Sequence, residues 1–295
     1  MKIVLCPGQG SQTVGMFVPW IEQVPGFEAK IKELAAASGK DLIHLGTLAD
    51  EETIRDTANA QPLIVAFSIA AFRTAVTDNF DAVAGHSVGE FAAAAIAGVL
   101  SDTEAMRLVA VRAEAMANES RQIETSMAAV IGGDPEEVER VILRAGLSIA
   151  NYNGAGQVVA AGTKERISNL VGTDIPKARV IELKVAGAFH TSFMQPAIEK
   201  LKVASQQILP KDPTKILWSN FDGRALDSGI AFLDSLIEQV ARPVRWDLCM
   251  QNFSGAETLE LPPAGALSGL VKRGADNVGT LALKLPSDVL KIGNR

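Results

Sequence analysis

The pentapeptide Gly85-His86-Ser87-Val88-Gly89 constrains the fold of this chain more than any other feature, because it separates two very different apolar runs. Residues 81–84, before it, are apolar after Asp81 and end at a glycine, as a short buried β-strand does. Residues 89–97, after it, are rich in alanine and are expected to form a helix that ends at Gly98. A serine at a sharp turn between a strand and a helix exposes its hydroxyl at the edge of a sheet. The pentapeptide therefore favours an α/β fold.

Further short strands alternate with helices in the first part of the chain. Residues 2–6 predict a buried strand, and helices are expected over residues 27–37 and 63–76. Pro62 suits the first position of the second of these helices, where its missing N–H costs nothing. Strands that alternate with helices predict an α/β domain with a mainly parallel sheet.

The middle of the chain follows a different pattern. It predicts strands over residues 127–131, 147–151, 157–161 and 179–185, with helices over residues 135–144 and 164–171. This βαββαβ order is typical of a ferredoxin-like unit, whose two ends lie close enough together for insertion into a larger domain. We therefore predict a large domain formed by residues 1–125 and 187–295, interrupted by a ferredoxin-like insert over residues 126–186.

The composition argues against several classes of function. Apolar residues make up 47% and charged residues 21% of the 295 residues, which is typical of a globular protein. The net charge of −6 argues against broad binding to nucleic acid or to an anionic membrane. Cys6 and Cys249 are the only cysteines and no metal-ligand cluster exists in the sequence, so we expect neither a disulfide framework nor a structural zinc site. We expect no other metal and no cofactor. No apolar run reaches the length of a membrane span and the first residues are too short for a signal peptide, so we expect a cytoplasmic protein.

Ser87 has two interpretations. It could be a nucleophile, in which case the Val88 N–H at the start of the following helix would donate to a developing oxyanion. It could instead form a simple capping box with Glu90. A cap requires neither Gly85 nor Gly89, so the sequence favours the nucleophile.

A serine nucleophile needs a base, and the chain has three histidines. We expect His190 to be the base, because it follows the last strand of the insert in a glycine-bearing loop that can return its imidazole to the large domain. His86 adjoins Ser87, but neighbouring side chains at a sharp turn point apart, so His86 is expected to line the site. His44 lies in a Leu-Ile-His-Leu stretch and is expected to lie on the surface or in the core, without a role in the site. Since no acidic residue is clearly placed beside His190, a backbone carbonyl could fix its tautomer.

Two further polar side chains are candidates for the site. The loop over residues 8–12 does not form a dinucleotide fingerprint, because Thr13 stands where glycine or alanine is needed. Gln9 in this loop could be a second oxyanion donor, or the loop could be a simple glycine turn. Arg112 lies on the apolar face of a helix expected over residues 102–117, which begins with a Ser101–Glu104 capping box. A buried guanidinium needs an anion, which could be an internal carboxylate or the carboxylate of a substrate.

Taken together, the motifs resemble those of the malonyl-CoA:acyl carrier protein transacylases, the acyltransferases of bacterial fatty acid synthesis. Six segments carry this resemblance in order along the chain: residues 7–12, 85–90, 153–159, 187–190, 243–246 and 267–270. The resemblance runs through nearly the whole chain. It implies an α/β-hydrolase-like core with a mainly parallel sheet and a ferredoxin-like insert.

The resemblance also implies a reaction. Malonyl-CoA would acylate Ser87 with His190 as the base, and the malonyl group would then pass to the pantetheine thiol of acyl carrier protein. Gln9 and the Val88 N–H would form the oxyanion hole, and Arg112 would bind the malonyl carboxylate.

Two more residues receive roles from the resemblance. Arg245 would orient His190 through its main-chain carbonyl, in place of the missing acidic residue. Phe189 would leave little room for an α-methyl branch on the substrate, which favours malonyl groups.

Three other functions share some of these motifs. A serine esterase or thioesterase also has Gly-x-Ser-x-Gly, although such hydrolases usually carry an acidic residue between the serine and the histidine. The malonyl-transferase subunit of malonate decarboxylase has the same motifs. A non-catalytic module that binds carrier protein is a third possibility, against which the intact Ser87, His190 and Gln9 argue. An acidic carrier protein needs a local basic patch, for which Lys272-Arg273 is a candidate.

Overall fold

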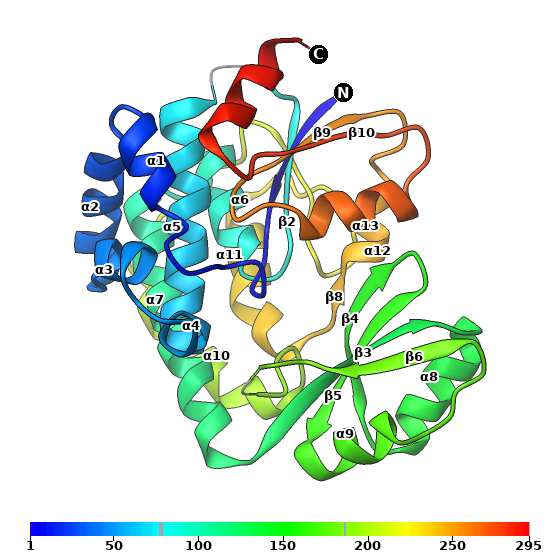
Figure 1. Cartoon of the computed structure of the whole chain (residues 1–295). Helices are drawn as coiled ribbons and strands as arrows, with labels where there is room; N and C mark the ends of the chain where they lie inside the picture. The colour runs from blue at the N-terminus through cyan, green and yellow to red at the C-terminus, as the bar shows by residue number, and fades with distance from the viewer. Residues whose placement is uncertain (77–78, 186, 295) are drawn as a thin grey trace.

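Strand β1 (Lys2–Cys6) runs through the middle of a parallel sheet and is buried on both faces. Val4 and Cys6 belong to the hydrophobic cluster on one face, and Ile3 and Leu5 belong to the cluster on the other. Strands covered on both faces are typical of parallel sheets, whose crossover helices lie on either side. The structure is a computed structural model that describes residues 1–76, 79–185 and 187–294 (Figure 1).

The parallel sheet has the strand order β10-β9-β1-β2-β7. Its other strands are β2 (Ala82–Gly85), β7 (Ile216–Leu217), β9 (Glu257–Glu260) and β10 (Gly279–Ala282). Every pairing between neighbours is parallel, so the carboxyl ends of these strands meet at one edge of the sheet. Ligands of parallel α/β sheets bind at that edge.

Helices cover both faces of this sheet. They are α1 (Val18–Gln23), α2 (Phe27–Ser38), α3 (Leu42–Thr47), α4 (Glu51–Arg55), α5 (Thr57–Ala75), α6 (Gly89–Ala97), α7 (Asp102–Gln122), α10 (Gln195–Ser205), α11 (Gly229–Glu238), α12 (Trp246–Met250) and α13 (Ala266–Gly274), with 3₁₀ turns η1 (Ser192–Met194), η2 (Gln239–Ala241) and η3 (Pro286–Asn294). Helices α5, α6 and α7 supply much of the cluster that contains Val4. Helices α12 and α13 lie in the cluster on the opposite face, with Ile3.

A second sheet, drawn mainly in green in Figure 1, has the order β6-β3-β5-β4-β8. Its strands are β3 (Thr125–Gly132), β4 (Ser148–Gly154), β5 (Gln157–Thr163), β6 (Ala178–Glu182) and β8 (Val244–Arg245), accompanied by helices α8 (Pro135–Arg144) and α9 (Lys164–Val171). The first four strands in this order pair antiparallel, and the chain order β3-α8-β4-β5-α9-β6 is the one predicted from the sequence. Strand β8 comes from the C-terminal part of the chain and pairs parallel with β4, which joins the two regions.

Some predicted boundaries are wrong. Helix α5 begins at Thr57, not at residue 63, because the Asp56 side chain accepts a hydrogen bond from the Ala58 N–H and caps the helix. Pro62 therefore lies inside the helix instead of at its first position. Strand β6 ends at Glu182, three residues before the predicted end. Ala186, where the predicted insert ends, lies outside the described residues.

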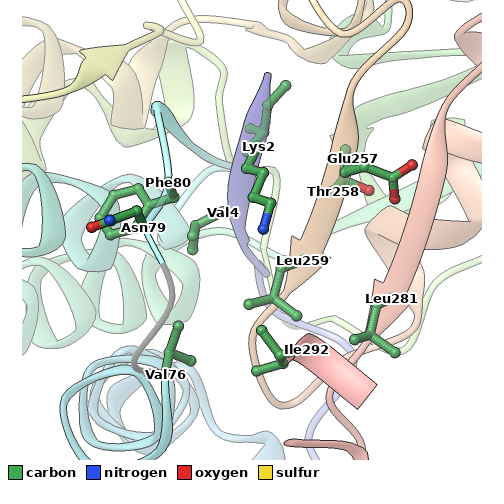
Figure 2. A pocket seen from close by; sticks show the side chains of 11 residues that line it. Lys2, Val4, Val76, Asn79, Phe80, Glu257, Thr258, Leu259, Leu281 and Ile292 are labelled. Carbon is green, nitrogen blue, oxygen red and sulfur yellow. The ribbon is translucent and has the colours of Figure 1, made fainter. Parts of the chain in front are cut away.

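A small apolar cavity lies at the other edge of the parallel sheet (Figure 2). It has a volume of about 50 Å³ and is lined by the first residues of β1 and β9 together with side chains such as Phe80, Leu281 and Ile292. Its position, away from the carboxyl ends of the strands, separates it from the candidate site. In the described part of the chain, no helix is both long enough and apolar enough to cross a membrane.

Candidate active site

A cavity of about 470 Å³ lies between the two sheets and contains the residues that the sequence singled out. Its walls come from the loop after β1, the turn after β2, the strands of the second sheet and the start of α13. The lining residues used below are Gln9, His86, Ser87, Val88, Arg112, Phe189, His190 and Arg273. The cavity lies at the carboxyl ends of the parallel strands, where the loops of such sheets form binding sites.

Ser87 occupies the turn between β2 and α6 in a strained backbone conformation. Its φ angle is 52°, in the left-handed region that side chains other than glycine rarely adopt. A Cβ atom at Gly85 would lie 2.3 Å from the backbone of Gly89, and one at Gly89 would lie 2.1 Å from the carbonyl oxygen of Cys6. Both glycines are therefore required by close approach of the backbone, as a sharp turn that presents a nucleophile requires.

The capping-box interpretation of Ser87 does not match the structure. Helix α6 has no side-chain cap, and the Glu90 carboxylate is buried and accepts hydrogen bonds from Asn220 and Gln239. The Ser87 side chain instead faces His190.

His190 and Ser87 form a hydrogen-bonded pair, although 103 residues separate them in sequence. The Nε2 atom of His190 lies 2.6 Å from the Ser87 Oγ, and its Nδ1 atom lies 2.9 Å from the carbonyl oxygen of Gln239. A carbonyl can only accept, so Nδ1 carries the proton and Nε2 presents its lone pair to the serine hydroxyl. Burial, and next the positive charge of Arg112, lower the pKa of His190 to about 3. The imidazole is therefore neutral near pH 7 and able to accept a proton.

The carbonyl that orients His190 belongs to Gln239, so the role expected for Arg245 is wrong. Gln239 lies in η2, which follows α11 and returns the chain to the site. Arg245 instead pairs with Asp247 at 2.8 and 2.9 Å, and its guanidinium stacks on Tyr152 of β4. Arg245 thus joins α12 to the second sheet.

Arg112 is almost completely buried, with 1% of its surface exposed, and it points toward Ser87. Its NH1 group donates to the Gln61 Oε1 at 2.6 Å, and its NH2 group donates to the Gln239 Oε1 at 3.0 Å and to the Ser87 Oγ at 3.3 Å. Within the described ranges no acidic side chain pairs with Arg112, and its Nε–H has no partner. Burial lowers the pKa of Arg112 to about 9, a direction that the charge of Glu90 opposes. Among the described residues its partners are neutral amides, a hydroxyl and the ring of Phe91, so the guanidinium remains able to bind an anion from a ligand.

The other residues that the sequence predicted for the site also line the cavity, namely Gln9, His86, Val88 and Phe189. Gln9 and the Val88 N–H both line the cavity beside Ser87, and among the described residues that N–H has no acceptor. Phe189 lines the cavity next to His190. The His86 ring lies 3.0 Å, measured from Nε2, from the Asn153 Oδ1 of β4.

The two remaining predictions concern the surface. His44 is exposed on α3 and does not line the cavity. Lys272 and Arg273 are both exposed at the end of α13, and Arg273 also reaches the rim of the cavity. Among the described residues, no cluster of three or more His, Cys, Asp or Glu side chains is placed to hold a metal ion.

Comparison with known proteins decides the family. Residues 3–273 match the family model described as the acyl transferase domain. The chain belongs to this acyl transferase family. The chain is also 45% identical to the malonyl CoA-acyl carrier protein transacylase of Mycobacterium tuberculosis, across 100% of both chains. The resemblance to malonyl-CoA:acyl carrier protein transacylases is thereby confirmed.

Solved structures support the same assignment. A crystal structure of MCAT from Mycobacterium tuberculosis superposes with a TM-score of 0.92 at 44% identity, covering 98% of each chain. A complex described as a type II PKS acyl-carrier protein with its malonyl-transacylase, PlMCAT:AntF, also has a TM-score of 0.92, at 29% identity over 100% of this chain and 99% of that chain. The expected α/β fold, with one all-parallel sheet, agrees with these acyl transferases.

Sequence reasoning missed three residues of this acyl transferase site. Gln239 supplies the carbonyl for His190 and an amide for Arg112. Asn220 accepts a hydrogen bond from the Ser87 N–H at 2.7 Å, and Gln61 accepts one from Arg112. None of the three lies in a motif next to a predicted strand end, so their positions follow from the fold and not from local sequence.

Proposed function

We propose that this acyl transferase moves a malonyl group from malonyl-CoA to the pantetheine thiol of acyl carrier protein, through a malonyl ester on Ser87. The observation that carries the proposal is that one oxygen, the Ser87 Oγ, lies 2.6 Å from the imidazole of His190 and 3.3 Å from the buried guanidinium of Arg112. A cation so close to the nucleophile suits an acyl group that carries a carboxylate one carbon beyond its thioester carbonyl. The names of the relatives support the same substrate and acceptor.

The first half-reaction forms the acyl enzyme. The Ser87 Oγ attacks the thioester carbonyl carbon of malonyl-CoA while His190 Nε2 takes the hydroxyl proton. The carbonyl oxygen becomes an oxyanion, to which the Val88 N–H and the Gln9 amide donate. When the carbon–sulfur bond breaks, CoA leaves as a thiol with the proton from His190, and the malonyl group stays on Ser87.

The second half-reaction uses the same residues in reverse. The pantetheine thiol of acyl carrier protein gives its proton to His190 and attacks the ester carbonyl. The carbon–oxygen bond to Ser87 then breaks, and His190 returns the proton to the serine oxygen. An oxyanion donor typically contributes about 3–4 kcal/mol to such steps, and the base about 10²–10⁴-fold in rate.

Arg112 also affects the base. Its positive charge is the second-largest cause of the low pKa of His190, after burial. A malonyl carboxylate bound to Arg112 offsets that charge, so the imidazole accepts the serine proton more readily when the correct substrate is present. The carboxylate therefore serves both selection and activation.

We also propose that the fold consists of a large core domain and a smaller inserted unit. The all-parallel sheet suits an α/β-hydrolase-like core formed by residues 1–125 and 187–295. The strand order β6-β3-β5-β4, with α8 and α9 packed in a hydrophobic cluster of their own, supports a ferredoxin-like insert over residues 126–186. We further propose a cytoplasmic location, because CoA thioesters are intracellular metabolites.

Intact-protein mass spectrometry tests the function. Wild-type protein mixed with malonyl-CoA should gain one malonyl group, and added acyl carrier protein bearing its pantetheine should remove that group and become malonylated. The Ser87→Ala variant should gain none. A wild-type adduct that is lost to water without an acceptor would favour a hydrolase, and binding of carrier protein without any adduct would favour a non-catalytic module.

A further inference from the structure

Glu90 is a buried ionisable group that Gln239 joins to Arg112, and the proposed reaction does not use it. Glu90 lies in the first turn of α6, three residues after Ser87, and only 1% of its surface is exposed. Its Oε1 atom accepts from the Asn220 N–H at 2.6 Å, and its Oε2 atom accepts a short hydrogen bond from the Gln239 Nε2. Burial is the largest effect on Glu90 and raises its pKa to about 8, although the hydrogen bonds from Asn220 and Gln239 and the charge of Arg112 act in the opposite direction. Both oxygens face N–H donors, so the ionised carboxylate is the form that these contacts fit.

The first partner, Asn220, connects Glu90 to the nucleophile turn. The Asn220 Oδ1 accepts from the Ser87 N–H at 2.7 Å, and its Nδ2 donates to the Gly85 carbonyl oxygen at 2.7 Å. One side chain thus bridges the residues on which the turn depends. Glu90 fixes the backbone from which that side chain projects.

The second partner, Gln239, connects Glu90 to both charged groups of the site. Its Nε2 donates to Glu90 and to the Ser87 carbonyl oxygen, and its Oε1 accepts from Arg112. Its main-chain carbonyl accepts from His190. A rotation of the Gln239 side-chain amide would therefore disturb its contact with Arg112, while the main-chain carbonyl that accepts from His190 stays in place.

The direction of these hydrogen bonds depends on the charge of residue 90. An ionised carboxylate can only accept, so the Gln239 amide must turn its NH₂ group toward Glu90 and its oxygen toward Arg112. A neutral amide at position 90 could instead present its own NH₂ group. The Gln239 amide would then rotate and place NH₂ against the guanidinium, where two donors repel.

We propose that Glu90 is a positioning residue, which sets the orientation of the Gln239 amide and thereby holds the Arg112 guanidinium where it binds the malonyl carboxylate. The proposal rests on the proposed function, because it assigns Glu90 to the selection of the acyl group. It predicts that loss of the charge at position 90 affects substrates with a carboxylate far more than neutral ones.

The Glu90→Gln variant tests this with malonyl-CoA and acetyl-CoA as a matched pair of substrates. We expect KM for malonyl-CoA to rise by about 10–100-fold, as for loss of a buried charge-assisted contact, with less than about threefold change for acetyl-CoA. The Glu260→Gln variant is the control. Glu260 is an equally buried glutamate that accepts two backbone hydrogen bonds from Leu267 and Ser268, and it has no link to Arg112. Its loss should lower stability and leave the ratio between the two substrates unchanged.

The Glu90→Asp variant provides the rescue. It keeps a carboxylate at position 90, which can accept from the Gln239 amide but cannot donate to it when ionised. We expect it to retain at least about tenfold of the preference for malonyl-CoA that Glu90→Gln loses. Glu90→Asp also keeps the net charge, so it remains informative if Glu90→Gln does not fold.

Equal losses on malonyl-CoA and acetyl-CoA in Glu90→Gln would overturn the proposal, because they would assign Glu90 to stability alone. A Glu90→Asp variant that selects malonyl-CoA no better than Glu90→Gln would overturn it as well. The wild-type malonyl adduct is measured first. If that adduct does not form, the proposed function fails, and the result is distinct from any failure at position 90.

Discussion

The two sheets of the molecule contribute to the cavity in different ways. The parallel sheet and its helices supply Ser87, Arg112 and the carbonyl that orients His190, all tied together by buried hydrogen bonds. The antiparallel sheet supplies mostly wall residues from β3, β4 and β5, and it has a hydrophobic cluster of its own around Ile142. The two regions are connected by the pairing of β4 with β8, by His86 with Asn153, and by Arg245 on Tyr152. This difference indicates that the reacting groups must be held rigidly relative to one another, in what we call the rigid cluster. The residues of β3, β4 and β5 only form the opposite wall of the cavity.

The largest expected effect lies in the rigid cluster. His190→Ala should lower kcat/KM for malonyl transfer by about 10²–10⁴-fold, because the serine loses its base. His44→Ala, at an exposed histidine on α3, is the control and should retain full activity. Initial rates of CoA release measure both variants, and a His190→Ala variant within tenfold of wild type would contradict the assignment of the base.

Replacement of the buried cation should have the next largest effect. Arg112→Ala should reduce kcat/KM for malonyl-CoA by about 10²-fold or more and spare acetyl-CoA, since a buried charge-assisted contact is worth about 2–5 kcal/mol. Arg245→Ala removes an arginine that joins α12 to the second sheet and does not contact Arg112, and any loss it causes should be equal for both substrates. Kinetics with the two thioesters separate these outcomes. Equal losses in Arg112→Ala would make Arg112 structural.

A change in the core of the insert should affect stability more than activity. Ile142→Ala should cost about 2–5 kcal/mol locally, through a cavity in the cluster between α8 and the antiparallel sheet. Hydrogen exchange should accelerate over β3–β6, while kcat/KM changes less than about threefold. Ile69→Ala in α5 is the matched control and should accelerate exchange around the parallel sheet instead. If Ile142→Ala accelerates exchange equally in both regions, the two sheets unfold as one unit.

The smallest expected effect is that of pH on kcat/KM, which should hardly change on mild acidification. The folded His190 has a pKa of about 3 instead of the ordinary 6.5, so acidification from about pH 7 to about pH 5 leaves the base neutral. kcat/KM for acetyl-CoA, which reports on the free enzyme and does not depend on a contact between Arg112 and a carboxylate, should therefore stay nearly constant over this range. A halving near pH 6.5 would show that the imidazole is solvated, and that the rigid cluster excludes less water than its burial suggests.

The sequence predicted what local patterns determine. Ser87 followed from a strand, two close-approach glycines and a helix, and Arg112 followed from its place on an apolar helix face. Pro62 was misplaced because Asp56 caps the helix one and a half turns earlier, and tertiary packing of α5 tolerates the proline. Arg245 received the role of Gln239 because the nearby segment 243–246 carries a visible motif, whereas a main-chain carbonyl has no sequence signal.

The contact between Gly89 and Cys6 has a consequence for how acyl transferases of this kind diversify. At that point the backbone of α6 touches the backbone of β1, so the loop that carries Gln9 and the turn that carries Ser87 are mechanically coupled. A side chain there would separate the oxyanion donors from the reacting oxygen. We infer that changes in substrate range accumulate across the cavity, among the side chains of β3–β5, where substitution leaves this coupling intact.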